Sequence, residues 1–233
     1  MLLEVIATCM DDARKAEASG ADRLELITAI TEGGLTPGIG LIEEVVHKIH
    51  IPVHVMVRPH SRSFVYDTDD VNTMIGEIKA IRRAGAAGVV LGALTEEGVI
   101  DEQTLSALLA HTDDMQVTFH RAFDELKNPL AGLAVLTRYK SITRILTSGG
   151  QKPAPEAIPQ IRTLVESTRG SHIKILAGHG LTPEGILHFI EQTGVEEVHF
   201  GSAVRLERAG LLPIDSGAVR RLVDSLKEND CKP

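Results

Sequence analysis

The chain has 233 residues, of which 43% are hydrophobic and 24% are charged, and its formal net charge is −8. A chain of this length buries about 70–75% of its unfolded surface, enough for one large domain without disulfides or a structural metal. The acidic balance disfavours nucleic acids and anionic membranes as partners, because both would repel the protein. We therefore expect one domain over residues 1–233, with a loose tail from about residue 228.

The cysteines and the first residues indicate the compartment. Cys9 and Cys231 lie near opposite ends of the chain and form no CxxC pair, which is typical of reduced intracellular proteins. The segment MLLEVIATCMDDARK has an acidic residue at position 4 and no basic region before its apolar run. It resembles neither a signal peptide nor a membrane span, so we predict a cytoplasmic protein.

Short β-rich runs alternate with longer amphipathic stretches along the whole chain. The runs predict strands at residues 2–8, 22–27, 52–59, 87–93, 115–122, 142–148, 172–178 and 196–202. Capping residues, prolines and glycines mark helices between them. The first helix is predicted to begin at Asp11 or Asp12 and to end at Gly20, and the longest to end at Gly85. A later helix is predicted to have Pro183 in its first turn and to end at Gly194, and the last helix to be capped by Asp215 or Ser216.

This alternation predicts the fold. Parallel strands need helical crossovers, and eight alternations in a chain of this length match a closed barrel. The alternative is an open doubly wound sheet, but the first turn, ATCMDDA, lacks the GxGxxG motif that a dinucleotide needs. We predict an α/β fold, a single-domain (β/α)8 TIM-type barrel, and no nucleotide cofactor.

Two turns rich in small residues follow the last two predicted strands, AGHG at 177–180 and FGSAVR at 200–205. In many barrels these loops hold a phosphate through backbone N–H groups, and glycine allows the oxygens to approach. The other interpretation is that small residues only let the strands turn sharply into helices. The candidate anion-binding residues in these turns are Gly178, Gly180, Gly201 and Ser202.

Polar side chains interrupt the predicted strands. Glu4 and Glu25 lie in the first two strands, Arg58 closes the third, and His120 and Asp124 lie at the end of the fifth. These five form the candidate catalytic set, because the carboxyl ends of all barrel strands meet at one mouth. Glu4 or Glu25 would be the general base, with His120 as the acid. Arg58 would clamp an anion. Alternatively, Glu4, Glu25 and Arg58 form a salt-bridged core without chemistry.

Several motifs together identify a family. The segments LEVIA, GADRLELI, EGGLTPG, IPVHVMVRP, VTFHRAFD, RILTSGGQ and AGHG occur in order between residue 2 and about residue 205. They closely resemble the CutC family, described as copper homeostasis proteins. The resemblance implies a cytoplasmic TIM-type barrel that is usually oligomeric. The matching polar positions are Glu4, Glu25, Arg58, His120, Arg121, Asp124, Ser148 and His199.

The resemblance adds to the candidate sites and also has limits. Arg121, Ser148 and Gly149 join Arg58 in the predicted anion-binding set. Two positions depart from the family pattern: His179 stands where a small residue is usual, and the cysteines of some relatives are not reproduced around Cys9.

The family name makes copper a candidate ligand. Cytosolic Cu(I) prefers thiolate and thioether groups that lie close together, and the two cysteines and five methionines are scattered. The candidate metal ligands are His120, His199 and Cys9.

Three functional hypotheses remain. The first is a protein that handles copper. The second is an isomerase, epimerase or lyase that acts on a small phosphorylated or carboxylated metabolite. The third is a scaffolding oligomer. The expected partners are a small-molecule anion or a copper ion, together with further copies of the chain in a homo-oligomer.

Overall fold

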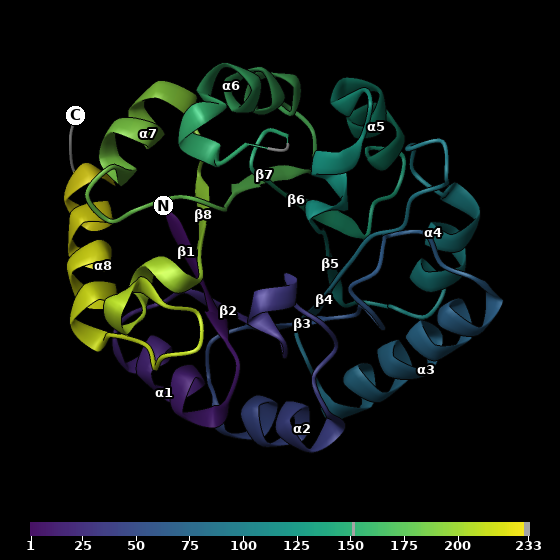
Figure 1. The fold of residues 1–233 in the computed structure, drawn as a ribbon, viewed down its shortest axis with the longest axis horizontal. Coiled ribbons are helices and arrows are strands. Elements are labelled where there is room, and N and C mark those ends of the chain that lie inside the picture. Colours follow the sequence, from purple (N-terminus) through teal and green to yellow (C-terminus); the bar gives the residue numbers. More distant parts are fainter. Residues whose placement is uncertain (151, 231–233) are drawn as a thin grey trace.

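The structure is a computed structural model that describes residues 1–150 and 152–230. Its strands pair in parallel and in chain order, and β8 pairs with β1 to close the barrel (Figure 1). The closed (β/α)8 barrel is therefore confirmed, and the open sheet is wrong. The strands are β1 (Leu2–Ala7), β2 (Arg23–Leu26), β3 (Val53–Met56), β4 (Gly88–Leu91), β5 (Gln116–Phe119), β6 (Ile142–Thr147), β7 (Lys174–Ala177) and β8 (Glu197–Phe200).

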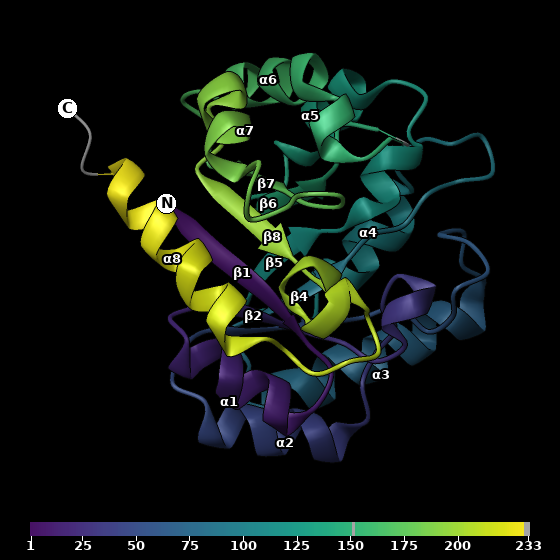
Figure 2. The same cartoon turned by 60° about the vertical axis from the view of Figure 1, so that its left-hand side comes forward.

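The α-helices form a ring around the strands, and α8 contacts both α7 and α1 so that the ring is complete (Figures 1 and 2). No helix in the described part of the chain is long and apolar enough to cross a membrane. The helices are α1 (Met10–Ala18), α2 (Ile39–Lys48), α3 (Thr68–Ala84), α4 (Glu102–Leu109), α5 (Pro129–Leu136), α6 (Ile158–Ser167), α7 (Ile186–Thr193) and α8 (Ser216–Asp230), with short 3₁₀ turns η1 (Ile30–Glu32), η2 (Arg121–Glu125), η3 (Ala154–Glu156), η4 (Ser202–Val204) and η5 (Leu206–Arg208).

The hydrophobic core lies mainly between the strands and the surrounding helices. Successive strand residues point alternately outward and inward, and Leu3, Val5 and Leu24 belong to the large buried apolar cluster. The inward-facing positions between them are different, because Glu4 and Arg23 are buried and charged. A polar layer therefore fills part of the barrel interior, where many barrels carry branched apolar residues.

Four predicted helix boundaries are confirmed. Gly85 and Gly194 end α3 and α7 in the left-handed conformation, with φ of 85° and 72°, which glycine adopts without strain. Gly20, with φ of 96°, follows the end of α1. Asp215 caps α8, since its carboxylate accepts hydrogen bonds from the N–H groups of Gly217 and Ala218.

Two helix starts were predicted wrongly. The N-cap of α1 is Cys9. Asp12 lies within the helix, where its carboxylate accepts hydrogen bonds from the N–H and hydroxyl of Thr8 and from Arg205. Pro183 precedes α7, since Thr182 accepts a hydrogen bond from Gly185 and forms a separate turn.

The end of the chain extends the last helix. Helix α8 continues to Asp230, so residues 228–230 of the expected loose tail are helical. Residues 231–233, including Cys231, lie outside the described residues.

Candidate functional site

A cavity of about 1120 Å³ opens at the carboxyl ends of the strands, the end of a barrel where active sites lie. It brings together residues that are far apart in the sequence. The predicted site residues that line it are Glu25, Arg58, His120, Arg121, Asp124, Gly180, His199, Gly201 and Ser202. Those that do not line it are Glu4, Cys9, Ser148, Gly149 and Gly178.

A row of three side chains crosses from the polar layer to the cavity floor. Strand pairing places Glu4 of β1 beside His199 of β8. His199 donates through Nδ1 to Glu4 Oε1 at 2.8 Å, and its Nε2 lies 3.7 Å from Glu25 Oε2. Oε1 of Glu25 is buried and has no hydrogen-bond partner in the described residues. Glu25 and His199 therefore meet at the cavity, and Glu4 orients the imidazole from below.

The charges of this row follow from burial and from its neighbours. Burial opposes ionisation of Glu4, but Arg23 and His199 outweigh it and hold the Glu4 pKa well below its usual range. Burial raises the pKa of Glu25 to about 7, with a further increase from Glu4. Burial lowers the pKa of His199, yet Glu25 and Glu4 outweigh this effect and raise it. The result is one fixed carboxylate, Glu4, beside a carboxyl and an imidazole whose pKa values are both raised.

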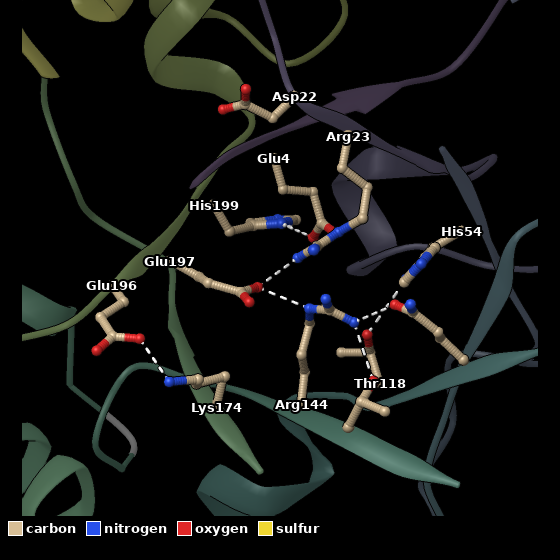
Figure 3. A network of polar contacts seen from close by, with 12 residues as sticks. Glu4, Asp22, Arg23, His54, Thr118, Arg144, Lys174, Glu196, Glu197 and His199 are labelled. Carbon is tan, nitrogen blue, oxygen red and sulfur yellow. Dashed lines mark hydrogen bonds and ion pairs between the residues drawn. The ribbon is translucent and has the colours of Figure 1, made fainter. Parts of the chain in front are cut away.

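Below the cavity, the charged groups are fully paired. Arg23 donates to Glu4 at 2.5 Å and to Glu197 at 2.8 Å, and Arg144 donates to Glu197 at 2.7 Å. Figure 3 shows the Glu4 carboxylate between His199 and Arg23, with both arginines directed to Glu197. The predicted salt-bridged core was thus wrong in its members, because Glu4 pairs with Arg23 and not with Arg58.

Sequence reasoning missed Arg23, Glu197 and Arg144, although a signal for one of them was present. Arg23 stands two residues before Glu25 in the same strand, so the two side chains face the same side of the sheet. An arginine two positions before an inward-facing glutamate also points into the barrel, where it can pair with carboxylates from neighbouring strands.

His120, which directly follows β5, lines the cavity and carries a buried N–H group. Its Nδ1 accepts a hydrogen bond from the Ala122 N–H at 3.2 Å, so the neutral ring carries its proton on Nε2. Burial and the nearby Arg58 lower the His120 pKa to about 3, which keeps the ring neutral. Nε2 is buried without a partner in the described residues. Gly92 makes room for this ring, because a Cβ there would lie 2.7 Å from Nδ1.

Arg58 holds loops together and is not a free anion clamp. Its guanidinium donates to the carbonyls of Glu32 at 3.0 Å, Gly34 at 3.4 Å and Ser61 at 3.4 Å. It also lies 4.5 Å from the centre of the Phe64 ring, and that ring packs 4.8 Å from His120. Most of its donors are used within the protein, so a bound anion would find little more than its unpaired Nε.

The turn after β6 is already filled by a carboxylate of the protein. Asp124 accepts hydrogen bonds from the N–H groups of Ser148 at 3.1 Å and Gly150 at 3.3 Å, and from the Thr147 hydroxyl. Gly149 donates to the same hydroxyl at 2.9 Å. The predicted anion contacts Ser148 and Gly149 therefore have partners within the chain.

Arg121 remains available in part. Its Nε donates to Asp124 at 2.8 Å and its Nη2 to Ser148 at 3.3 Å. Its Nη1 donates no hydrogen bond within residues 1–150 and 152–230, and the side chain is 37% exposed at the cavity.

Both interpretations of the two late turns have support. A Cβ on Gly178 would lie 2.8 Å from Leu146, and one on Gly201 would lie 2.9 Å from Ile6, so packing alone requires small residues there. Gly178 also uses its N–H on Thr147. Gly180 has φ of 79° and packs on Pro153. The N–H groups at the cavity that donate no hydrogen bond within the described residues include those of Gly180, Leu181, Ser202 and Ala203.

Residue 179, the departure from the family pattern, lines the cavity. His179 has φ of 69°, a left-handed conformation that favours glycine. Its carbonyl accepts a hydrogen bond from Ala154 at 2.9 Å, which helps to hold this conformation.

The donor set fits copper incompletely. Cys9 is exposed at the start of α1 and lies outside the cavity lining. His120 presents N–H rather than a lone pair, so it needs a change of tautomer to bind a metal through Nε2. His199 and Met56 do line the cavity. No group of three or more His, Cys, Asp or Glu in the described ranges is arranged to hold a metal ion.

Comparisons with known proteins agree on the family. The CutC family model matches residues 1–204. The human copper homeostasis protein cutC homolog is 38% identical over 198 residues, which cover 85% of this chain and 72% of the human protein. A CutC family protein of Proteus mirabilis is 41% identical over 197 residues, covering 84% and 77% of the two chains.

Solved structures agree with this result. The structure of a copper homeostasis protein CutC from Streptococcus agalactiae superposes with a TM-score of 0.81 at 31% identity, and covers 85% of this chain and 97% of its own. Phosphoribosyl anthranilate isomerase from Thermococcus kodakaraensis, at 13% identity and a TM-score of 0.65, shares the barrel over 97% of this chain and 98% of its own. The chain belongs to the CutC family.

Proposed function

We propose that the cavity is the active site of an enzyme that moves a proton on a small anionic metabolite. The observation that carries this proposal is the Glu25–His199 pair, because one member has an unpaired buried oxygen and both line the same cavity. A buried polar atom without a partner costs free energy. A ligand that supplies the partner would recover that cost.

The pair has the properties of a general acid–base catalyst. Efficient proton transfer needs a group whose pKa lies near the operating pH, and the pKa of Glu25 is about 7. Glu4 holds Nδ1–H of His199, so Nε2 is the nitrogen that exchanges a proton with Glu25. Groups whose pKa values are perturbed at a cavity favour catalysis over a structural role.

The part of the rim that follows β5, β7 and β8 favours an anionic group on the ligand. Nη1 of Arg121 and the N–H groups of Gly180, Leu181, Ser202 and Ala203 are unused donors that line it. Several unused donors along one cavity suit a phosphate or carboxylate. The reaction class that this supports is an isomerase, epimerase or lyase.

Mass spectrometry of retained ligands tests this function. The purified protein is treated with chelator, desalted and denatured, and the released small molecules are identified. We expect a phosphorylated or carboxylated compound at near-stoichiometric amount, lost from Arg121→Ala but kept by Arg82→Ala, which removes an exposed arginine on α3. A protein that releases no anion, and gains none from a metabolite extract, would contradict the proposal.

Copper is the second candidate ligand, because relatives carry the name copper homeostasis protein. The thioether of Met56 and the imidazole of His199 line the cavity and are ligands that Cu(I) accepts. Anaerobic Cu(I) titration against a chromophoric chelator distinguishes the candidates. If copper is the ligand, Met56→Leu and His199→Gln weaken its binding, whereas Met10→Leu does not.

The family resemblance is the basis for our proposals on cellular location and assembly. We propose a cytoplasmic protein that forms a homo-oligomer. Analytical ultracentrifugation of the full chain, with a sedimentation coefficient above that of a 25.1 kDa monomer, would support the assembly.

A further inference from the structure

We propose that the substrate carries a carbonyl group, whose oxygen accepts a hydrogen bond from Nε2–H of His120 while Glu25 removes a proton from the adjacent carbon. This inference rests on the proposed enzymatic function and deepens it, since it names the substrate class. That class is a small enolisable aldehyde or ketone that also bears a phosphate or carboxylate.

The first argument is the placement of two unsatisfied groups. Oε1 of Glu25 and Nε2 of His120 are both buried without a partner in the described residues, and both residues line the cavity. Glu25 lies on β2 and His199 on β8, the two neighbours of β1, whereas His120 follows β5 across the closed barrel. Both atoms are covered in the ligand-free structure, so side chains must shift slightly for a ligand between them to meet the base on one side and the donor on the other.

The second argument is the fixed tautomer of His120. The Ala122 N–H occupies Nδ1, so the neutral ring can only donate through Nε2. A neutral imidazole that donates a hydrogen bond stabilises an oxyanion without itself giving up a proton. His120 is thereby suited to polarise a carbonyl rather than to act as the general acid.

The third argument is the apolar wall around this donor. The Phe64 ring packs 4.8 Å from His120 and the Phe119 ring 6.1 Å from it. Met56, Ile27 and Phe64 line the cavity. Such a wall excludes water and strengthens the hydrogen bond to a developing negative charge.

The step balances without a further reactant. The C–H bond next to the carbonyl breaks, its proton passes to Glu25, and its electron pair forms the carbon–carbon double bond. The carbonyl π electrons move to oxygen, where Nε2–H of His120 stabilises the enolate. Return of a proton to the same carbon from the other face gives an epimer. Where that carbon carries a hydroxyl, its O–H proton moves to the former carbonyl oxygen while Glu25 or His199 returns a proton to the former carbonyl carbon, and the new carbonyl on the neighbouring carbon makes the product an isomer.

Two measurements on the full chain test the inference. The first is binding of phosphoglycolohydroxamate, a planar enediolate mimic, against inorganic phosphate by calorimetry. We expect the mimic to bind about 100-fold more tightly, as is usual for transition-state analogues. This preference for the mimic should fall about 10-fold or more in His120→Ala. It should be unchanged in His188→Asn, which replaces a surface histidine on α7.

The second measurement is hydrogen exchange by NMR in D₂O with a panel of sugar phosphates that carry an α-hydroxycarbonyl group. Exchange at the carbon next to the carbonyl is expected for at least one compound. It should fall about 1000-fold in Glu25→Gln, which removes the base, and remain in Glu96→Gln on the surface.

A third measurement uses only the wild-type protein, so it does not depend on whether a variant folds. ¹⁵N NMR of the wild-type imidazoles should show His120 as the Nε2–H tautomer. An Nδ1–H tautomer would overturn the inference outright. Equal binding of the mimic and phosphate, with no exchange in any compound, would also overturn it, yet the proposed function would stand if an anion without an enolisable carbonyl were retained. Retention of no anion would overturn both.

Discussion

The barrel interior has two polar regions that differ in one respect. In the lower region, Arg23, Arg144 and Glu197 satisfy one another and the Glu4 carboxylate, while the neutral His54 of β3 beside them keeps its buried Nε2 without a partner in the described residues. At the cavity floor, Glu25 and His120 each keep a buried polar atom without a partner in the described residues. Both regions consist of charged or titratable side chains in the same fold. Mutual pairing of the charged groups indicates a structural role below, and unpaired polar atoms of residues that line a cavity indicate a place for a ligand.

The largest effect is expected from breaking the lower region. Arg23→Met leaves two buried carboxylates, Glu4 and Glu197, without their shared cation. Removing one partner of a buried ion pair costs about 3–5 kcal/mol. Urea unfolding followed by circular dichroism would measure the loss, with Arg82→Ala on the surface as the control. A loss below about 1 kcal/mol would show that the lower region is not what stabilises the barrel.

A smaller, pH-dependent effect is expected from the cavity floor. Burial raises the Glu25 pKa from 4.5 to about 7, so the folded state prefers the protonated form. Its favourable contribution is complete below pH 4.5 and is lost as the pH rises through 7. Glu25→Gln should therefore be more stable than wild type at pH 8, by on the order of 2 kcal/mol, and similar at pH 4.5. Parallel stability curves for the two proteins between pH 4.5 and 8 would refute the raised pKa.

The smallest effect is expected outside both regions. Cys9 is the exposed N-cap of α1 and makes no capping hydrogen bond through its side chain. Serine is a better N-cap, so Cys9→Ser should raise stability by about 0.5 kcal/mol. It should leave the binding of anions and of Cu(I) unchanged. Lost Cu(I) binding in this variant would instead support a metal role for the cysteine.

Most of the fold could be predicted from the sequence, because alternating patterns determine local structure. All eight strand runs, the closure of the barrel and the glycine ends of α3 and α7 follow from such patterns. The start of α1 could not be predicted from them. Asp12, one of the two predicted caps, lies inside the helix and pairs with Arg205, nearly the whole chain away.

The sequence predicted which residues lie at the site, but not which of them bind one another. Glu25, His120 and His199 meet at the cavity because all strand ends of a barrel do. The roles of Arg58 and Ser148 could not be predicted from the sequence. The carbonyl of Glu32 accepts from Arg58 and the Asp124 carboxylate accepts from Ser148, and both acceptors come from other segments of the chain. Which hydrogen-bond donors stay free depends on side-chain geometry, and the sequence pattern does not contain that geometry.

Arg58 also has a mechanical consequence for the entrance of the barrel. Its guanidinium joins the segment between β2 and α2 to the segment between β3 and α3, and its own N–H and carbonyl bond to Thr36 of the first segment. Neither segment can lift without breaking bonds to the other. These two segments of the rim should therefore move as one body, and substitution of Arg58 should uncouple them.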